Sequence, residues 1–321
     1  MGIATYNKTR AWQELILLIN AQWSNGMIPH IVFHENNPNY FPGPNHWQIK
    51  TNSKTSCHSQ PPVLASIILE MVKVGDEYDL KKSQSLFNSI MAYHEWFFSA
   101  RDPNNEGFLS IVHPWESGRD NSPDWDIALS NITLDTNLLI QRKDDNIIND
   151  KSQRPTDNDY NKYMQIVFKC EELNWDNIEI YEKGLFNVCD VGVQFIFIRA
   201  CKDLLKIAEY LNKDEESINL IKLWIKRYED GCQLLCNKKY KAFSCLNIKT
   251  NILQKGISCA SMLYAYADIG TKLQHDSMIE HSKRILYYTN YGQSFPSWDP
   301  CDSNFDCKRY WRGPVSVSYT Q

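Results

Sequence analysis

The sequence has no long apolar run and no excess of basic charge, and both absences narrow the range of functions. No stretch of the 321 residues reaches the roughly 20 consecutive apolar residues that a membrane helix needs. The formal net charge is −4 and the isoelectric point is about 6.1, so there is no basic field for nucleic acid or an anionic membrane. We therefore expect neither as a partner. The start of the chain also lacks the basic and then apolar pattern of a secretory signal, so we expect a cytoplasmic protein.

Paired cysteine motifs and nucleotide-binding motifs are missing as well. The ten cysteines include no Cys-x-x-Cys pair. Cys232 and Cys236 lie one helical turn apart, but no matching His or Cys pair follows at the spacing of a zinc site. Buried thiols in a reducing compartment are the simpler interpretation. The chain contains no glycine-rich phosphate loop and no nucleophile elbow. We expect no metal and no cofactor.

Helical periodicity dominates the chain, and we expect a single domain over residues 1–321. Two expected helices, 63–74 and 190–211, are apolar on almost every side and should be buried, whereas the helix expected over 215–237 is amphipathic. Alternation of buried and amphipathic helices indicates two concentric rings. The remaining helices are expected at 9–23, 80–100, 123–141, 256–269 and 272–288, with one more from about residue 157 and a short possible strand at 108–112.

Aromatic residues make up 12% of the chain, and several of them lie on a proline-rich loop between residues 26 and 47. The prolines argue against a helix or a central strand in this loop. The rings of His30, His34, Tyr40 and Trp47 could face a ligand or fix the loop on the core. The residues alone leave both interpretations open.

The most informative stretch covers residues 113–126, where carboxylates and indoles are concentrated. Its acidic residues are Glu116, Asp120, Asp124 and Asp126, and its indoles are Trp115 and Trp125. Indole faces stack on the apolar faces of a pyranose ring, and carboxylates bind hydroxyls or exchange a proton with a glycosidic oxygen. An acidic helix N-terminus is the alternative, with Asp120 or Ser122 as the cap. Composition alone does not separate a sugar site from a helix cap.

The same stretch resembles the signature of a known enzyme family. Glu116-Ser-Gly-Arg-Asp-Asn-Ser-Pro-Asp-Trp-Asp is similar to a segment of the family 63 glycoside hydrolases, in the branch with mannosylglycerate and glucosylglycerate hydrolases. Other segments resemble the family in the same order, at 23–33, 40–44, 59–62, 154–157 and 310–314. The resemblance implies an all-α fold, the (α/α)6 toroid of six-hairpin glycosidases. It also implies that relatives extend beyond this chain at both ends, so we expect a toroid without its first helix and its closing C-terminal helices.

For the site, the resemblance implies an inverting hydrolysis in which Asp120 is the general acid. An inverting enzyme needs a second carboxylate, roughly 6.5–9.5 Å from the first, to activate water. In the family this general base is a glutamate beyond the last shared segment, so we expect the base to be absent and activity to be weak or missing. The residues implied to bind substrate are Tyr40, Gln60, Trp115, Glu116, Arg154, Tyr160, Trp311 and Arg312. The fork of Arg154 suits a glycerate carboxylate, with a salt bridge at a helix end as the alternative.

Three functions fit these features. The first is an inverting α-glycoside hydrolase that acts on a small glucosyl- or mannosyl-conjugate such as mannosylglycerate or glucosylglycerate. The second is a carbohydrate-binding or partner-binding pseudoenzyme that keeps the aromatic cleft. The third is an activity like that of glycan-processing mannosyl-oligosaccharide glucosidases. The ligand is a small molecule or an oligosaccharide in each enzymatic case, and the missing lumenal signal favours the first function over the third.

Overall fold

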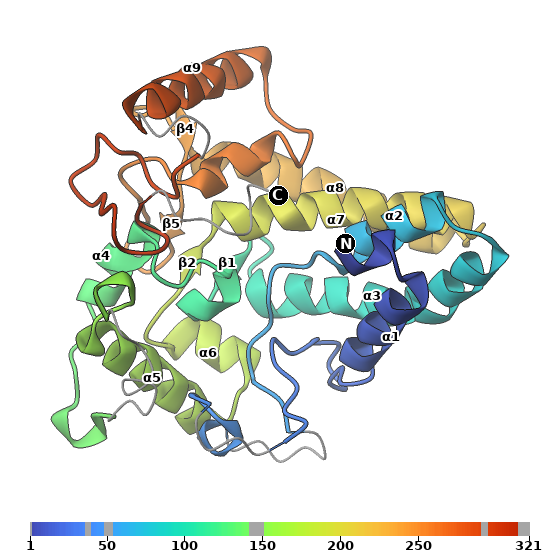
Figure 1. Cartoon of the computed structure of the whole chain (residues 1–321), viewed down its shortest axis with the longest axis horizontal. Helices are drawn as coiled ribbons and strands as arrows, with labels where there is room; N and C mark the ends of the chain where they lie inside the picture. The colour runs from blue at the N-terminus through green and yellow to red at the C-terminus, as the bar shows by residue number, and fades with distance from the viewer. Residues whose placement is uncertain (1, 36–39, 48–53, 141–150, 290–294, 314–321) are drawn as a thin grey trace.

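The computed structural model of the protein describes residues 2–35, 40–47, 54–140, 151–289 and 295–313 (Figure 1). Its α-helices are α1 (Lys8–Ile19), α2 (Leu64–Lys73), α3 (Glu77–Arg101), α4 (Asp126–Ser130), α5 (Asp157–Glu172), α6 (Asn177–Lys183), α7 (Val191–Tyr210), α8 (Glu215–Gly231) and α9 (Lys272–Thr289). Its strands have two residues each: β1 (Ser110–Ile111), β2 (Val188–Cys189), β3 (Cys236–Asn237), β4 (Ala242–Phe243), β5 (Leu246–Asn247) and β6 (Ile252–Leu253). Helices therefore carry the architecture, as expected.

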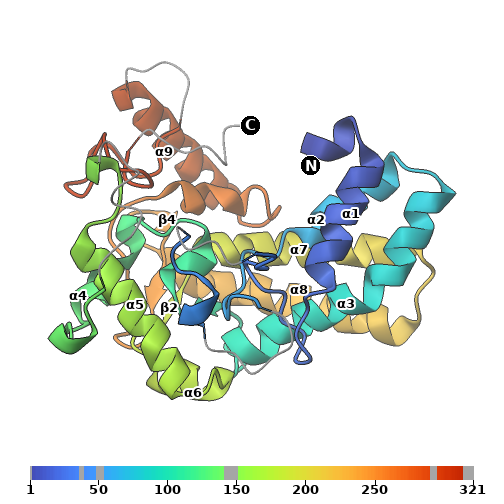
Figure 2. The ribbon, with the colours of Figure 1, turned by 60° about the horizontal axis from the view of Figure 1, so that its bottom comes forward.

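Helix α7 forms the centre of the fold, where it packs against both α2 and α8 (Figures 1 and 2). Its apolar side chains point to almost every side, and Phe195, Phe197 and Leu204 are among those fully buried. In contrast, α8 buries a single stripe that contains Ile221 and Trp224. An inner helix paired with an amphipathic outer one is the arrangement of the (α/α)6 toroid, which confirms the expected fold class.

The N-terminal helices are tied together by a buried carboxylate. Asp76 and Asp79 form a capping box at the start of α3, which satisfies two backbone donors of its first turn. The Asp79 carboxylate, 2% exposed, also accepts hydrogen bonds from the indole of Trp12 at 2.7 Å and from the ammonium of Lys8 at 2.8 Å. Because both donors lie on α1, this one side chain fixes α1 against α3.

A small antiparallel sheet with the strand order β1-β2-β5-β6 joins the ends of the helices. Ser110 pairs with Cys189, and Val188 pairs with Asn247. The sequence indicated only the β1 segment, because strands of two residues leave no alternating pattern to detect. The sheet matters for the site, since β1 leads into residues 113–126 and β2 leads into α7.

Three expected helices differ from the structure. In place of a helix over 123–141, a 3-10 turn leads into α4, which ends at Ser130, and Asp135 then caps a separate 3-10 turn at Thr136–Leu138; residue 141 lies outside the described residues. The segment 256–269 forms the 3-10 helix Cys259–Tyr264. Helix α8 ends at Gly231 rather than near 237. In each case, 3-10 turns replace part of the α-helix that the periodicity predicts.

Within the described part of the chain, no helix is both long enough and apolar enough to cross a membrane. The ribbon views place α1, α2 and α3 on one side of the molecule and α4 and α5 on the other (Figure 2). The loops between these two groups surround the pocket described next.

Candidate active site

A pocket of about 340 Å³ is the centre of the candidate site. Its walls come from the proline-rich loop near the N-terminus, the start of the segment before α2, the loop after β1, the start of α5 and the segment after α9. The residues that line it are His30, Ile31, Tyr40, Phe41, Pro42, Trp47, Gln60, Trp115, Gly118, Asp120, Arg154, Tyr160 and Tyr310. Segments far apart in the sequence therefore meet here, on loops at the ends of the helices.

The loop after β1 is shaped by its own side chains. The imidazole of His113 accepts a hydrogen bond from the Trp115 N–H at 3.0 Å and so starts the 3-10 turn Pro114–Ser117. Gly118 ends this turn with a φ of +69°, a conformation that favours glycine. A Cβ at Gly118 would also lie 3.3 Å from the side-chain oxygen of Gln60. The turn delivers Asp120 into the pocket.

Asp120 is held by two tyrosines. The Tyr310 hydroxyl donates a hydrogen bond to Oδ2 of Asp120 at 2.5 Å, and the Tyr163 hydroxyl donates to its backbone carbonyl at 2.7 Å. Burial raises the pKa of the Asp120 carboxyl above its ordinary value, against the opposing effects of the Tyr310 hydrogen bond and the charge of Arg154. A carboxyl group that keeps its proton inside a pocket has the property that a general acid requires.

Five of the eight residues predicted to bind substrate also line the pocket: Tyr40, Gln60, Trp115, Arg154 and Tyr160. The side-chain amide of Gln60 donates a hydrogen bond to the backbone carbonyl of Trp115 at 2.6 Å. This bond joins the segment before α2 to the loop after β1. The Trp115 ring lies edge-on to Trp47, with ring centroids 6.2 Å apart. The guanidinium of Arg154 lies 5.7 Å from the centre of the Tyr310 ring. Aromatic walls, an amide and a guanidinium thus surround the Asp120 carboxyl.

The other three predicted residues do not line the pocket. Glu116 is 4% exposed and forms an ion pair with Arg101, whose Nη2 lies 2.5 Å from Oε1; it also accepts the Val112 N–H at 2.9 Å. Arg312 reaches both carboxylate oxygens of Asp126. Trp311 is 9% exposed. None of the three is among the residues that line the pocket, and internal ion pairs hold Glu116 and Arg312. Their contact with a sugar stays a prediction.

The sequence did not single out several of the pocket residues as binding residues. His30 and Trp47 belong to the aromatic loop, which the residues alone do not assign to a ligand. Tyr310 stands in a segment that resembles the family, in which the resemblance implies the next two residues, Trp311 and Arg312, as binding residues. Burial lowers the pKa of His30 to about 4, so its imidazole is neutral at pH 7. Motif similarity was the one signal for Tyr310, since its aspartate partner is 190 residues away.

A buried charge cluster forms around Arg119, the residue next to Asp120. The Arg119 guanidinium, 1% exposed, donates to Asp124 at 2.6 Å and to Asp190 at 2.7 Å. Asp190 also accepts the Gly192 N–H at 2.8 Å and so caps α7. The cluster fastens the residue next to Asp120 to the central helix. Burial raises the pKa of Asp190, which the charge of Arg119 opposes.

The described residues contain no group of three or more His, Cys, Asp or Glu side chains placed to hold a metal ion. Asp120 is the one carboxylate among the described residues that line the pocket. Proton donation to a bound ligand is what such an arrangement can perform.

Helix hairpins whose ends gather an aromatic pocket around one buried carboxyl of raised pKa place the protein among the helical-toroid glycoside hydrolases. Comparison with known proteins gives the family. The model of the mannosylglycerate hydrolase MGH1-like glycoside hydrolase domain matches residues 1–316, and the chain belongs to that family. The resemblance of the motifs to family 63 glycoside hydrolases is thereby confirmed.

Named relatives and solved structures agree with this assignment. The chain is 34% identical to a mannosylglycerate hydrolase of Thermus thermophilus, over 99% of this chain and 76% of the relative. It is 32% identical to the mannosylglycerate hydrolase MGH1 of Selaginella moellendorffii, over 98% of this chain and 64% of the relative. The chain thus spans about two thirds to three quarters of these relatives. A crystal structure of the Thermus thermophilus enzyme with Tris and D-glycerate matches with a TM-score of 0.91 at 34% identity, over 98% of this chain and 75% of that one.

Proposed function

We propose that this chain carries the substrate pocket and the general acid of an inverting α-glycoside hydrolase for a small glucosyl- or mannosyl-conjugate, such as mannosylglycerate or glucosylglycerate. One observation carries the proposal: Asp120 is a carboxyl of raised pKa that lies in the pocket beside an indole, an amide and a guanidinium. A group that donates a proton to the leaving glycosidic oxygen must be protonated before the bond breaks, and burial favours this protonated form of Asp120.

The neighbouring side chains suit the two halves of such a substrate. Trp47 and Trp115 offer ring faces and edges to the apolar side of a sugar. Arg154, on the segment that leads into α5, offers a planar fork to a carboxylate, the group that distinguishes glycerate from an ordinary alcohol. Solved structures of the Thermus thermophilus relative contain D-glycerate in one case and glucose in another, which supports this division of the pocket.

A binding-only protein is the second candidate, and a specific observation favours it. Inversion needs a second carboxylate roughly 6.5–9.5 Å from the acid, whereas the pocket lining that the structure describes contains only Asp120. Without a group to activate water, the same pocket would bind a glycoside and release it unchanged. The two candidates share the ligand and differ in turnover.

We also propose one domain over residues 1–321 and a cytoplasmic location. A single hydrophobic cluster runs from Trp12 on α1 to Ile285 on α9, which is what one domain requires. All ten cysteines are free, and free thiols fit a reducing compartment.

The test compares the chain with its Asp120→Asn variant. Hydrolysis of mannosylglycerate and glucosylglycerate is followed by release of glycerate, and proton NMR records the anomer formed first. We expect an inverted anomer from the unchanged chain and no turnover from Asp120→Asn, with ligand affinity retained because the amide keeps the shape of the carboxyl. Turnover in Asp120→Asn would refute the role of Asp120, and a retained anomer would refute inversion.

Calorimetric titration with the same glycosides separates the second candidate. Binding without turnover in both proteins would establish a binding-only protein. Arg154→Lys serves as the ligand control, because it keeps the charge and removes the fork. We expect it to weaken binding of glycerate about tenfold, the loss of one good charged hydrogen bond, and to leave binding of free glucose almost unchanged.

A further inference from the structure

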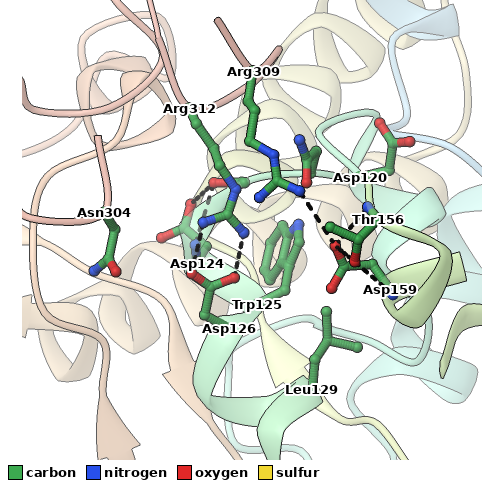
Figure 3. A network of polar contacts seen from close by, with 12 residues as sticks. Asp120, Asp124, Trp125, Asp126, Leu129, Thr156, Asp159, Asn304, Arg309 and Arg312 are labelled. Atoms are coloured by element: carbon green, nitrogen blue, oxygen red, sulfur yellow. Dashed lines mark hydrogen bonds and ion pairs between the residues drawn. The ribbon is translucent and has the colours of Figure 1, made fainter. Parts of the chain in front are cut away.

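The segment after α9 crosses the Asp120 loop as a strap, which we define as residues 297–313. Its two ends are joined by a hydrogen bond from the Ser297 N–H to the Gly313 carbonyl at 2.9 Å. Figure 3 shows Arg309 and Arg312 reaching from the strap towards the acidic side chains below it. Arg312 forms a two-pronged ion pair with Asp126, the geometry that fixes orientation as well as distance.

Between these anchors the strap delivers Tyr310 to Asp120. The backbone carbonyl of Tyr310 accepts a hydrogen bond from the Asn121 amide at 3.0 Å, and its N–H donates to the Gln153 carbonyl at 3.2 Å. Backbone contacts on two sides therefore set the position of the Tyr310 ring. Its hydroxyl lies 2.5 Å from Oδ2 of Asp120, at the short end of the range for hydroxyl donors and charged acceptors.

The direction of this hydrogen bond follows from the environment of the phenol. Burial, together with the nearby Asp120 charge, raises the pKa of Tyr310 far above its ordinary value. The hydroxyl therefore keeps its proton at every pH of interest and donates it to Oδ2 whenever Asp120 is ionised. A donor on one carboxyl oxygen leaves the transferable proton to the other oxygen, Oδ1.

We propose that Tyr310 is a positioning residue for the general acid: its hydroxyl holds Oδ2 of Asp120, directs the proton to Oδ1, and stabilises the carboxylate that remains after proton transfer. The ion pair between Arg312 and Asp126 is the latch that keeps Tyr310 in place. This inference rests on the proposed function of Asp120. In the step concerned, the Oδ1–H bond breaks and its electron pair stays on Asp120, while the proton bonds to the glycosidic oxygen, which leaves with the electrons of its bond to the sugar.

The hydrogen bond must strengthen as this step proceeds, because a carboxylate accepts more strongly than a neutral carboxyl group. The same bond favours the charged form of Asp120 and so opposes the effect of burial on its pKa. Removing the hydroxyl should therefore raise the pKa of Asp120, by about one to two pH units for a hydrogen bond to a charged group. A purely structural tyrosine would leave this pKa unchanged.

The test is a titration of Asp120 by carbon NMR in protein labelled with ¹³C-aspartate, with the signal assigned through Asp120→Asn. We expect Tyr310→Phe to raise the pKa of Asp120 by about one to two pH units. Tyr163→Phe is the matched control, because that hydroxyl bonds the backbone carbonyl of Asp120 rather than its carboxyl group, and its effect should be less than half as large. An unchanged pKa in folded Tyr310→Phe would overturn the proposal.

Two further measurements keep the test decisive. If Tyr310→Phe fails to fold, difluorotyrosine at position 310 keeps the shape and makes the hydroxyl a stronger donor, so the pKa of Asp120 should fall instead of rise; no change there would refute the proposal. Arg312→Gln should raise the pKa in the same direction as Tyr310→Phe, and should add nothing in the Tyr310→Phe background. An unchanged pKa of Asp120 in Arg312→Gln would refute the role of the Arg312–Asp126 ion pair as the latch.

Turnover then separates this inference from the proposed function. In Tyr310→Phe, kcat/KM at low pH should fall about tenfold. The alkaline limb of its pH profile should shift to higher pH, because the pKa of Asp120 is raised. If Asp120→Asn keeps its activity, the acid assignment fails, whatever the titration gives. If Asp120→Asn is inactive and Tyr310→Phe moves neither the pKa nor the alkaline limb, only the role of Tyr310 fails.

Discussion

Replacing Glu116 with Gln distinguishes a structural carboxylate from one that binds a sugar. In the structure, the Glu116 carboxylate accepts hydrogen bonds from Nε of Arg101 at 3.2 Å and from Nη2 of Arg101 at 2.5 Å. It also accepts a hydrogen bond from the Val112 N–H at 2.9 Å. Both charged side chains are almost fully buried, at 4% and 2% exposure. Glutamine keeps the shape but turns an acceptor into a donor, so Arg101 would face an amide N–H and lose its counter-charge.

The expected loss of stability follows from that uncompensated charge. Removing one partner of a buried ion pair costs about 3–5 kcal/mol. With an unfolding entropy of about 2.1 cal/mol/K per residue, 321 residues lose about 1.5 °C in melting temperature per kcal/mol. We therefore expect Glu116→Gln to melt about 5–8 °C below the unchanged protein. Thermal unfolding followed by circular dichroism, at fixed protein concentration, measures this directly.

Two variants test the reasoning behind the number. Glu182→Gln changes an exposed carboxylate on α6 and should shift the melting temperature by less than about 1 °C. Arg101→Met in the Glu116→Gln background removes the orphaned cation and should recover part of the loss, as replaced buried pairs often do. The reasoning is refuted if Glu116→Gln melts within about 1 °C of the unchanged protein, above all if it loses sugar binding at the same time.

Three further outcomes follow from other contacts. Burial would raise the pKa of Asp79, but the hydrogen bonds that it accepts from Lys8, Trp12 and the Asp76 N–H outweigh burial and lower this pKa. The stability that Asp79 adds is therefore present above its unfolded pKa near 4 and is lost as pH falls through the folded value. Asp79→Asn should flatten the acid limb of a profile of melting temperature against pH. Gly231→Ala should lower the melting temperature, because its Cβ would lie 1.8 Å from the Gly107 carbonyl oxygen. Asp190→Asn should lower the midpoint of urea unfolding, because it removes one of the two carboxylates that pair with the buried Arg119.

The features that follow from local patterns could be predicted from the sequence. The bounds of α2, α3, α7 and α9 agree within a few residues with the expected helices, because apolar periodicity, caps and turn residues all point to the same structure there. The expected helix over 123–141 failed where a cap at Asp135 starts a new turn. The small sheet was missed because its strands pair over long distances and have two residues each.

The motif at 113–126 could be recognised in the sequence, but the side chains that pair with its carboxylates in the fold could not. The motif at 113–126 contains four carboxylates that look equivalent in the sequence. In the fold, Glu116, Asp124 and Asp126 each pair with a different arginine, whereas Asp120 accepts a hydrogen bond from the hydroxyl of Tyr310. A neutral donor compensates burial less than a cation does, and burial raises the pKa of Asp120. Tertiary partners thus distinguish Asp120 from the other three carboxylates, and one of these partners is 190 residues away. Each partner can be exchanged by mutation to test the proposal that Asp120 is the acid.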